Sequence, residues 1–209
     1  MIELKQNIPL SKWSNLKVGG PARYFTEPDS VEELKRVLET ARQIKQSIYI
    51  LGGGTNILWG DEGFNGLVIK PKFDFISREE NLVTVGAGTL VDKLVDYTLE
   101  NSLAGLDWAG GLPGTVGGAV FGNAGCFGGE IKDNLVEVLS LDTDSLQERR
   151  RSNKDCAFDY RESVFKKNPN KEIIVQATIE FGPGDAGELR KRVEEERQYR
   201  RDRQPLEYP

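Results

Sequence analysis

Histidine is absent from this chain of 209 residues, and only two cysteines, Cys126 and Cys156, occur. Without histidine the chain has no Ser-His nucleophile pair, lacks the commonest general base and has few ways to bind zinc. The two cysteines make neither a disulfide framework nor the spacing of a zinc site. We therefore predict no metal site, and any chemistry must use Arg, Lys, Tyr, Ser, carboxylates or a bound cofactor.

Long apolar runs are also absent. No stretch approaches the ~18–20 apolar residues that cross a bilayer, and the segment from Met1 to Asn7 lacks the basic start and apolar block of a signal peptide. The 28 Lys and Arg against 33 Asp and Glu leave a net charge of −5, which argues against nucleic-acid binding. The sequence predicts a cytoplasmic protein without membrane insertion, built as one large domain or two small ones.

Glycine, by contrast, is concentrated in one place. Nine of the 23 glycines lie between Gly110 and Gly129. Glycine is favoured where the backbone takes a positive φ or approaches another group closely. Few polar side chains interrupt this run, so we expect its contacts to be made by backbone N–H groups. Such groups in a concave turn bind anions, phosphates above all.

The pattern of apolar residues predicts two α/β units, divided between Pro71 and Asn81. We set the subdomains at residues 1–75 and 76–209. In the first, a capping box at Ser30 opens a helix that ends near Ile44. The expected strands and later helices are a buried strand at 47–51, strands at 66–70, 82–85, 135–141 and 173–181, a helix capped by Thr89, and a charged helix at 185–203.

A second glycine motif, Gly52-Gly53-Gly54-Thr55-Asn56, directly follows the expected strand at 47–51. It is typical of a pyrophosphate cradle, but an ordinary tight loop has the same composition, and both interpretations stay open. Two further glycine spacings are not standard nucleotide fingerprints. After Gly86-x-Gly88, Val91 stands where a Rossmann pattern has its third glycine, and Gly111-x-x-Gly114-x-x-Gly117 lacks the Lys-Ser/Thr ending of a P-loop.

The third unusual segment runs from Asp159 to Lys166 and places charges between Tyr160 and Phe165. Its Arg161 suits a carboxylate or developing negative charge. A surface strand explains the composition equally simply and is favoured on composition alone. For two basic clusters we also prefer a structural role over a binding role. Arg149 to Arg151 are expected in a solvated turn, and the arginines of the last helix on a solvated helical face.

Four blocks in order resemble one family, the UDP-N-acetylenolpyruvoylglucosamine reductases. They are Asn15 to Ala22, Leu51 to Leu58, Gly111 to Ala119 together with Asn123 to Gly125, and Tyr160 to Lys166. The resemblance covers nearly the whole chain and implies an α+β fold, the vanillyl-alcohol-oxidase or PCMH type of FAD-binding fold. It assigns FAD binding to these residues: Gly52, Gly53, Gly54, Thr55, Asn56, Gly111, Leu112, Pro113, Gly114, Thr115, Gly117 and Gly118.

The resemblance also implies an activity. NADPH would reduce a non-covalently bound FAD, and the flavin would then reduce UDP-N-acetylglucosamine enolpyruvate to UDP-N-acetylmuramate, a peptidoglycan precursor. Non-covalent binding agrees with the missing histidine. Arg161 matches the arginine that stabilises an enolate-like intermediate in the family, and the hydride chemistry belongs to the cofactor.

The chain departs from the family at its end. The family's proton-donating serine motif, its distal glutamate and its substrate-binding third domain do not follow Gln204-Pro205. Ser163 belongs to another block and is not expected to replace that serine, and nothing catalytic is assigned to Cys126. We expect the FAD-binding portion of a longer reductase. The alternatives are a binding module that holds FAD without turnover, or another FAD-linked oxidoreductase of the superfamily.

Overall fold

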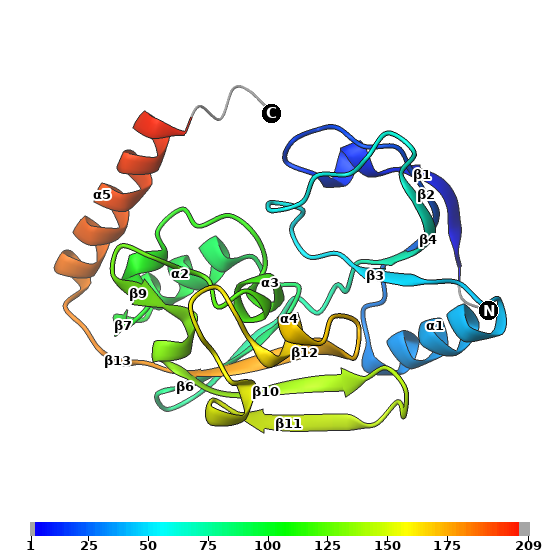
Figure 1. Ribbon diagram of the computed structural model, residues 1–209. Helices are drawn as coiled ribbons and strands as arrows, with labels where there is room; N and C mark the ends of the chain where they lie inside the picture. Colours follow the sequence, from blue (N-terminus) through cyan, green and yellow to red (C-terminus); the bar gives the residue numbers. More distant parts are fainter. Residues whose placement is uncertain (1–2, 205–209) are drawn as a thin grey trace.

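The computed structural model describes residues 3–204 (Figure 1). Pro205 of the Gln204-Pro205 pair lies outside the described residues. The helices are α1 (Val31–Gln43), α2 (Val91–Glu100), α3 (Val116–Phe121), α4 (Val164–Lys167) and α5 (Ala186–Arg203). The strands are β1 (Lys5–Pro9), β2 (Pro21–Thr26), β3 (Ile48–Ile50), β4 (Phe64–Ile69), β5 (Ile76–Glu79), β6 (Leu82–Gly86), β7 (Leu103–Ala104), β8 (Gly125–Cys126), β9 (Gly129–Glu130), β10 (Leu135–Asp142), β11 (Glu148–Ser152), β12 (Glu172–Glu180) and β13 (Gly182–Pro183).

Two sheets organise the fold. The first has the order β1-β2-β4-β3, in which β2, β4 and β3 run parallel and β1 is antiparallel. The second has the order β11-β10-β12-β6-β5 and is antiparallel throughout. Figure 1 shows α2 and α3 on one side of the second sheet, with α5 beyond α2. This mixture of helices, parallel strands and antiparallel strands is an α+β architecture.

Helix α1 begins where the capping signal predicts. Ser30 is its N-cap, and the Ser30 hydroxyl accepts a hydrogen bond from the Glu33 N–H. The Glu33 carboxylate reaches back to the Asp29 N–H at 3.1 Å, one residue before the cap. The buried side chains are Leu34, Val37, Leu38 and Ala41, whereas Ile44, expected on the same stripe, is 40% exposed. The helix stops at Gln43, so Ile44 falls outside the apolar face.

Two local expectations were wrong. The strand at 47–51 is not buried: β3 is the edge of its sheet, and its residues are only partly covered. Thr89 does not cap α2. Its hydroxyl donates to the Phe75 carbonyl at 3.3 Å, and Leu90 occupies the N-cap without a side-chain bond. This hydrogen bond of the Thr89 side chain joins the segment before β5 to the start of α2.

The hydrophobic core joins the two halves of the chain. Along β4, Leu67 and Ile69 face a cluster that also contains Leu34 of α1 and Val138 of β10. Val68, which points the other way, belongs to a second cluster on the opposite side of the first sheet. The two sheets therefore share one core, and the subdomain boundary at residue 75 stays a prediction.

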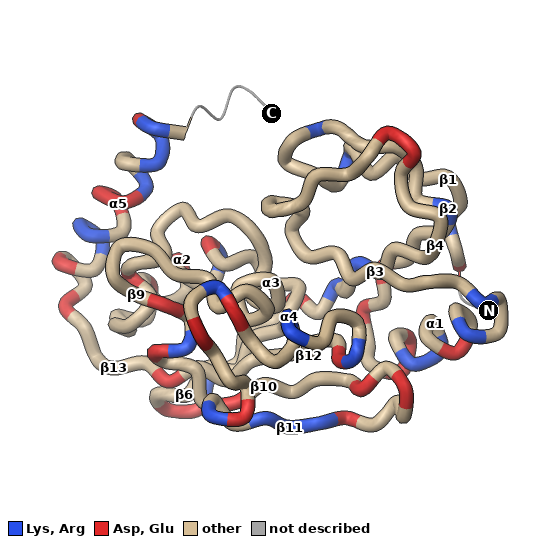
Figure 2. The backbone as a smooth tube through the Cα atoms, viewed as in Figure 1, with Lys and Arg blue, Asp and Glu red and all other residues tan. Residues whose placement is uncertain are grey.

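The last helix is more than a solvated face. Basic and acidic residues follow one another along α5 (Figure 2), but Arg197 donates to Asp92 and Asp96 of α2 at 2.6 and 2.7 Å. The Leu189 and Val193 side chains of α5 are buried. In residues 3–204 no helix is both long and apolar enough to cross a membrane.

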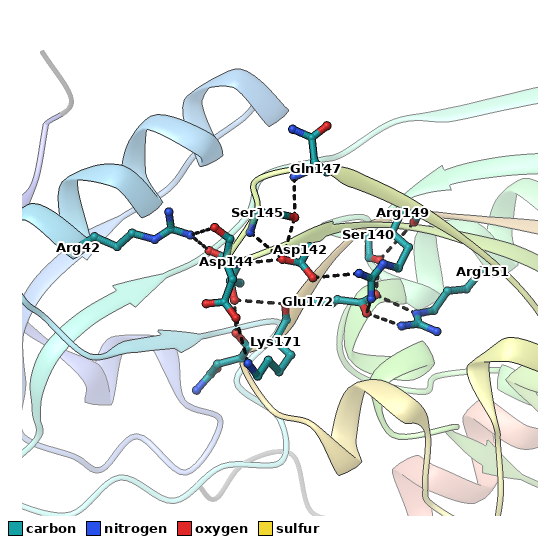
Figure 3. A network of polar contacts seen from close by, with 12 residues as sticks. Arg42, Ser140, Asp142, Asp144, Ser145, Gln147, Arg149, Arg151, Lys171 and Glu172 are labelled. Carbon is teal, nitrogen blue, oxygen red and sulfur yellow. Dashed lines mark hydrogen bonds and ion pairs between the residues drawn. The ribbon is translucent and has the colours of Figure 1, made fainter.

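The basic triplet at 149–151 is an edge strand, β11, and not a turn. Glu172 of β12 accepts hydrogen bonds from Arg149 at 2.9 Å, from the Arg151 guanidinium at 2.9 and 2.5 Å, and from the Ser140 hydroxyl at 2.6 Å (Figure 3). Its side chain is only 8% exposed. The hydrogen bond from Arg151 and the other donors lower the pKa of Glu172. One carboxylate thus links three neighbouring strands.

A further bond joins this region to the first half of the chain. Arg42, near the end of α1, donates to the carbonyls of Thr143 and Asp144 in the turn between β10 and β11 (Figure 3). The same turn is held by Lys171, which pairs with Asp144 at 2.9 Å. Helix α1 is thereby attached both through the shared core and through this turn.

Replacing Glu172 by Gln is expected to lower the free energy of unfolding by ~1–3 kcal/mol at neutral pH, because charged hydrogen bonds to two arginines are lost. Because the pKa is lowered on folding, this contribution is present above about 4.5 and is lost as the pH falls further. Urea unfolding at pH 7 and at pH 3 measures the difference. The matched control is Glu137→Gln, which breaks the exposed pair with Arg150 and should cost less than ~1 kcal/mol. Equal losses in both variants, or a loss for Glu172→Gln that persists at pH 3, would contradict the assignment.

Candidate functional site

The two glycine segments meet in the folded protein. A Cβ atom on Gly53 would lie 2.7 Å from the Cα of Gly114, and one on Gly52 would lie 2.8 Å from the Thr115 hydroxyl. Gly114, at φ +114°, would in turn place a Cβ 3.1 Å from the Thr55 hydroxyl. The backbones approach too closely for side chains to fit between them. The structure therefore brings together segments that lie some 60 residues apart in the chain.

The loop after β3 leaves consecutive backbone donors free. In the part of the chain that the structure describes, no hydrogen bond is donated by the N–H groups of Gly52, Gly53, Gly54, Thr55 and Asn56. The loop is held instead by its carbonyls: Gly54 accepts from the Asn15 N–H at 3.0 Å, and Gly52 accepts from the Lys70 ammonium at 3.4 Å. A row of free N–H groups is the arrangement that binds an anion.

Most backbone N–H groups of the second segment, residues 111–118, donate hydrogen bonds within the protein. The N–H groups of Gly111, Gly117 and Gly118 donate to Asp92, to the Ala87 carbonyl and to the Thr115 hydroxyl. Thr115 is the N-cap of the short helix α3. Within residues 111–118 of the described chain, only Gly114 and Thr115 have backbone N–H groups without a protein acceptor. A Cβ on Gly117 would lie 2.9 Å from the Ala87 Cβ, so close packing requires this glycine, whereas Gly118 is exposed. The Thr115 nitrogen lies near the first loop, 3.4 Å from the position of a Cβ on Gly53.

Of the other predicted positions in this run, Leu112 packs against the main core and Pro113 is exposed. The glycine-rich segments themselves carry few charges (Figure 2).

Helix α5 fastens the beginning of the glycine run. The Glu196 carboxylate, only 8% exposed, accepts from the Gly110 N–H at 3.1 Å, and the Arg200 guanidinium donates to the Gly110 carbonyl at 2.9 Å. Burial raises the pKa of Glu196. Arg200 also donates to the Cys126 sulfur at 3.0 Å. Cys126 is thus a half-buried thiol that accepts a hydrogen bond, and burial raises its pKa.

Arg161 lies beside the far end of the glycine run. Its guanidinium donates to the Gly125 carbonyl at 2.6 Å, and its own carbonyl accepts from the Lys166 ammonium at 2.7 Å. The residue is exposed and has a φ of +55°, which is rare for a side chain of this size. Buried Asn123 supports the turn by donating to the Asp159 carbonyl at 3.0 Å. The segment is a turn followed by α4, not the alternative surface strand.

Ser163 has a structural role. It is fully buried, accepts from the Lys166 N–H as the N-cap of α4, and donates to the Phe121 carbonyl at 2.7 Å. A hydroxyl with both functions occupied and no solvent access is a poor proton donor to a ligand. This agrees with the expectation that Ser163 does not supply the acid.

Lys70 is not among the residues that the sequence singles out, yet it touches the first loop. It directly follows β4, and β3 lies parallel to β4, so the residues after both strands meet at one edge of the sheet. Its ammonium lies 5.7 Å from the centre of the Trp13 ring. Its place directly after a strand that pairs in parallel is the signal for this position, because ligands bind at the carboxyl ends of parallel strands.

A family of FAD binding domains matches residues 22–147 of the sequence. That range contains both glycine segments. The chain is thus of the FAD-binding class, and its α+β fold of the vanillyl-alcohol-oxidase or PCMH type is confirmed. A glucooligosaccharide oxidase from Acremonium strictum shares the fold, with a TM-score of 0.60 at 15% identity over 87% of this chain and 41% of the oxidase.

More similar proteins define the family. UDP-N-acetylenolpyruvoylglucosamine reductases from Lactobacillus gasseri and Latilactobacillus sakei are 36% and 38% identical and match all of this chain, which covers 69% and 68% of their lengths. The crystal structure of the reductase from Thermus caldophilus has a TM-score of 0.81 at 29% identity, over 96% of this chain and 70% of that chain. The chain belongs to the UDP-N-acetylenolpyruvoylglucosamine reductase family, as its four sequence blocks indicate.

Replacing Gly54 by Ala tests the close packing of the first loop. Gly54 has a φ of +69°, and a Cβ there would lie 1.9 Å from the Trp13 carbonyl oxygen. Gly128 is the matched control, because its φ is +86° but nothing lies within 4 Å of its Cβ position. Gly54→Ala should lower the free energy of unfolding by ~1–3 kcal/mol more than Gly128→Ala, measured by urea unfolding. Equal effects would show that backbone conformation alone, and not the contact with Trp13, requires glycine.

Proposed function

We propose that FAD binds across the two glycine segments, with its phosphates on the loop at residues 52–56. The observation that carries this proposal is the row of free N–H groups opposite Gly114 and Thr115. The match of residues 22–147 to FAD binding domains supports it. The site residues proposed for FAD are those of the sequence analysis. Four of them, Gly111, Leu112, Gly117 and Gly118, act by fixing the shape of the second segment and not as N–H donors to FAD. Their N–H groups bond within the protein.

We further propose that the chain carries the FAD-binding part of an NADPH-dependent reductase that acts on UDP-N-acetylglucosamine enolpyruvate. The names of its relatives support the substrate. The bound flavin supplies the hydride chemistry. The absence of histidine from the chain supports a non-covalent mode of binding. The division at residue 75 and the cytoplasmic location remain predictions.

The residues of this chain have separable tasks. The loop at 52–56 neutralises phosphate charge with aligned dipoles. Arg161, exposed at the end of the glycine run, offers a guanidinium to a carboxylate or to negative charge that develops on the substrate. The left-handed turn and Lys166 hold the Arg161 backbone in place. One N–H of the guanidinium bonds to the Gly125 carbonyl, and its other donors remain for a ligand. Ser163 takes no part.

A side chain placed between the loop at 52–56 and the segment at Gly114 is expected to weaken FAD binding. Gly53→Ala places a methyl group 2.7 Å from the Gly114 Cα, so the two backbones must separate. We expect the dissociation constant for FAD to rise about 10-fold or more, measured by titration of the apoprotein with flavin fluorescence. Gly182→Ala is the control, because nothing lies within 4 Å of that position. If FAD binds Gly53→Ala as tightly as the unsubstituted chain, the assignment of FAD to this site is wrong. If the unsubstituted chain binds no FAD, the proposed function is refuted.

Arg161→Lys is expected to reduce turnover without reducing flavin affinity. Lysine keeps the charge but loses the planar fork that pairs with a carboxylate. We expect kcat for NADPH oxidation with UDP-N-acetylglucosamine enolpyruvate to fall about 100-fold, with an unchanged FAD dissociation constant. Arg150→Lys, on edge strand β11, is the control. Full turnover in Arg161→Lys would argue against the role of Arg161, and no turnover in the unsubstituted chain would confine the function to FAD binding.

A further inference from the structure

Lys70 is placed unusually for a lysine. Its side chain is partly buried, and its ammonium donates to the Gly52 carbonyl at 3.4 Å, a long hydrogen bond. The same ammonium faces the Trp13 ring at 5.7 Å. Gly52 begins the row of free N–H groups, so a positive charge lies directly beside the proposed phosphate site.

Among the residues that the structure describes, no carboxylate pairs with the positive charge of Lys70. Burial, the largest effect, lowers the pKa of Lys70. Glu27 is the nearby carboxylate, but its oxygens pair with Lys5 and Lys72 at 3.1 Å each. In the described part of the chain, the Lys70 ammonium forms no ion pair and only the one hydrogen bond to Gly52. An ammonium has three donors, so this group keeps the capacity to bind an anion.

We propose that Lys70 supplies the positive charge that holds the phosphates of the bound dinucleotide on the loop at residues 52–56. This inference rests on the proposed binding of FAD to that loop. Backbone N–H groups carry only partial charges, whereas a pyrophosphate carries full negative charges, and a lysine acts on them as a compact point charge. A bound anion would also offset the burial that disfavours the charged ammonium.

A purely structural role is the competing explanation. Lys70 joins the Gly52 carbonyl to the Trp13 ring, and this contact alone would order the loop. The two roles differ in their dependence on charge. A structural tie affects the loop at any ionic strength, whereas attraction between an ammonium and phosphates weakens as salt screens it.

The test measures FAD binding to the full chain at low and high salt, for Lys70→Met, Lys70→Arg and the unsubstituted protein. ADP, which has the pyrophosphate without the flavin, serves as a competing probe. We expect Lys70→Met to weaken both FAD and ADP by about 10- to 100-fold and to lose most of the salt dependence. Lys70→Arg should retain most of the affinity. Lys72→Met is the matched control, because Lys72 is more exposed and pairs with Glu27.

Several outcomes would overturn the inference. Unchanged affinity in Lys70→Met would show that the phosphates do not need this charge, while FAD binding itself stands. A loss of affinity with undiminished salt dependence would assign Lys70 the structural role. If Lys70→Met does not fold, as judged by circular dichroism, Lys70→Gln replaces it, and Lys70→Arg still decides whether charge suffices. Absence of saturable FAD binding by the unsubstituted chain would refute the proposed function and this inference together.

Discussion

The direct approach of two backbones is the constraint on which the rest of the structure depends. Gly53 and Gly114 meet with no room for a side chain, and this contact closes the space between the first sheet and the helices of the second. Residues around it are arranged to maintain it: Thr115 caps α3, Asn15 binds the Gly54 carbonyl, and α5 holds Gly110. A site made from backbone groups needs such support, because it has few side chains that adjust to errors in position.

The two halves of the chain are coupled by more than this contact. Leu67 and Ile69 of the first sheet share a core with the second, and Arg42 bonds the turn between β10 and β11. The loop at 52–56 and the segment at Gly114 therefore lie between elements that are held together by both of these contacts. Its free N–H groups are pre-ordered before any ligand arrives, which reduces the entropy that binding must overcome.

Much of this arrangement could be predicted from the sequence, and the reasons for the failures are physical. The Ser30 cap, the strand at 82–85 and the helix ending at Arg203 follow from local patterns that the structure preserves. Position within a sheet is not local, so β3 was expected to be buried although it is an edge strand. Glycine composition predicts the candidate site, but it does not tell which N–H groups remain free. That depends on Asp92 and Glu196, which are distant in sequence.

The strand order of the second sheet bears on how the protein is made. Strand β12 lies between β10 and β6 but is the last of the five strands in the chain. Until residue 180 has left the ribosome, β6 and β10 each present an edge with no neighbour on that side. Open strand edges invite pairing with other chains, and contacts this distant in sequence form slowly. The nascent chain is therefore most prone to aggregation just before β12 is inserted.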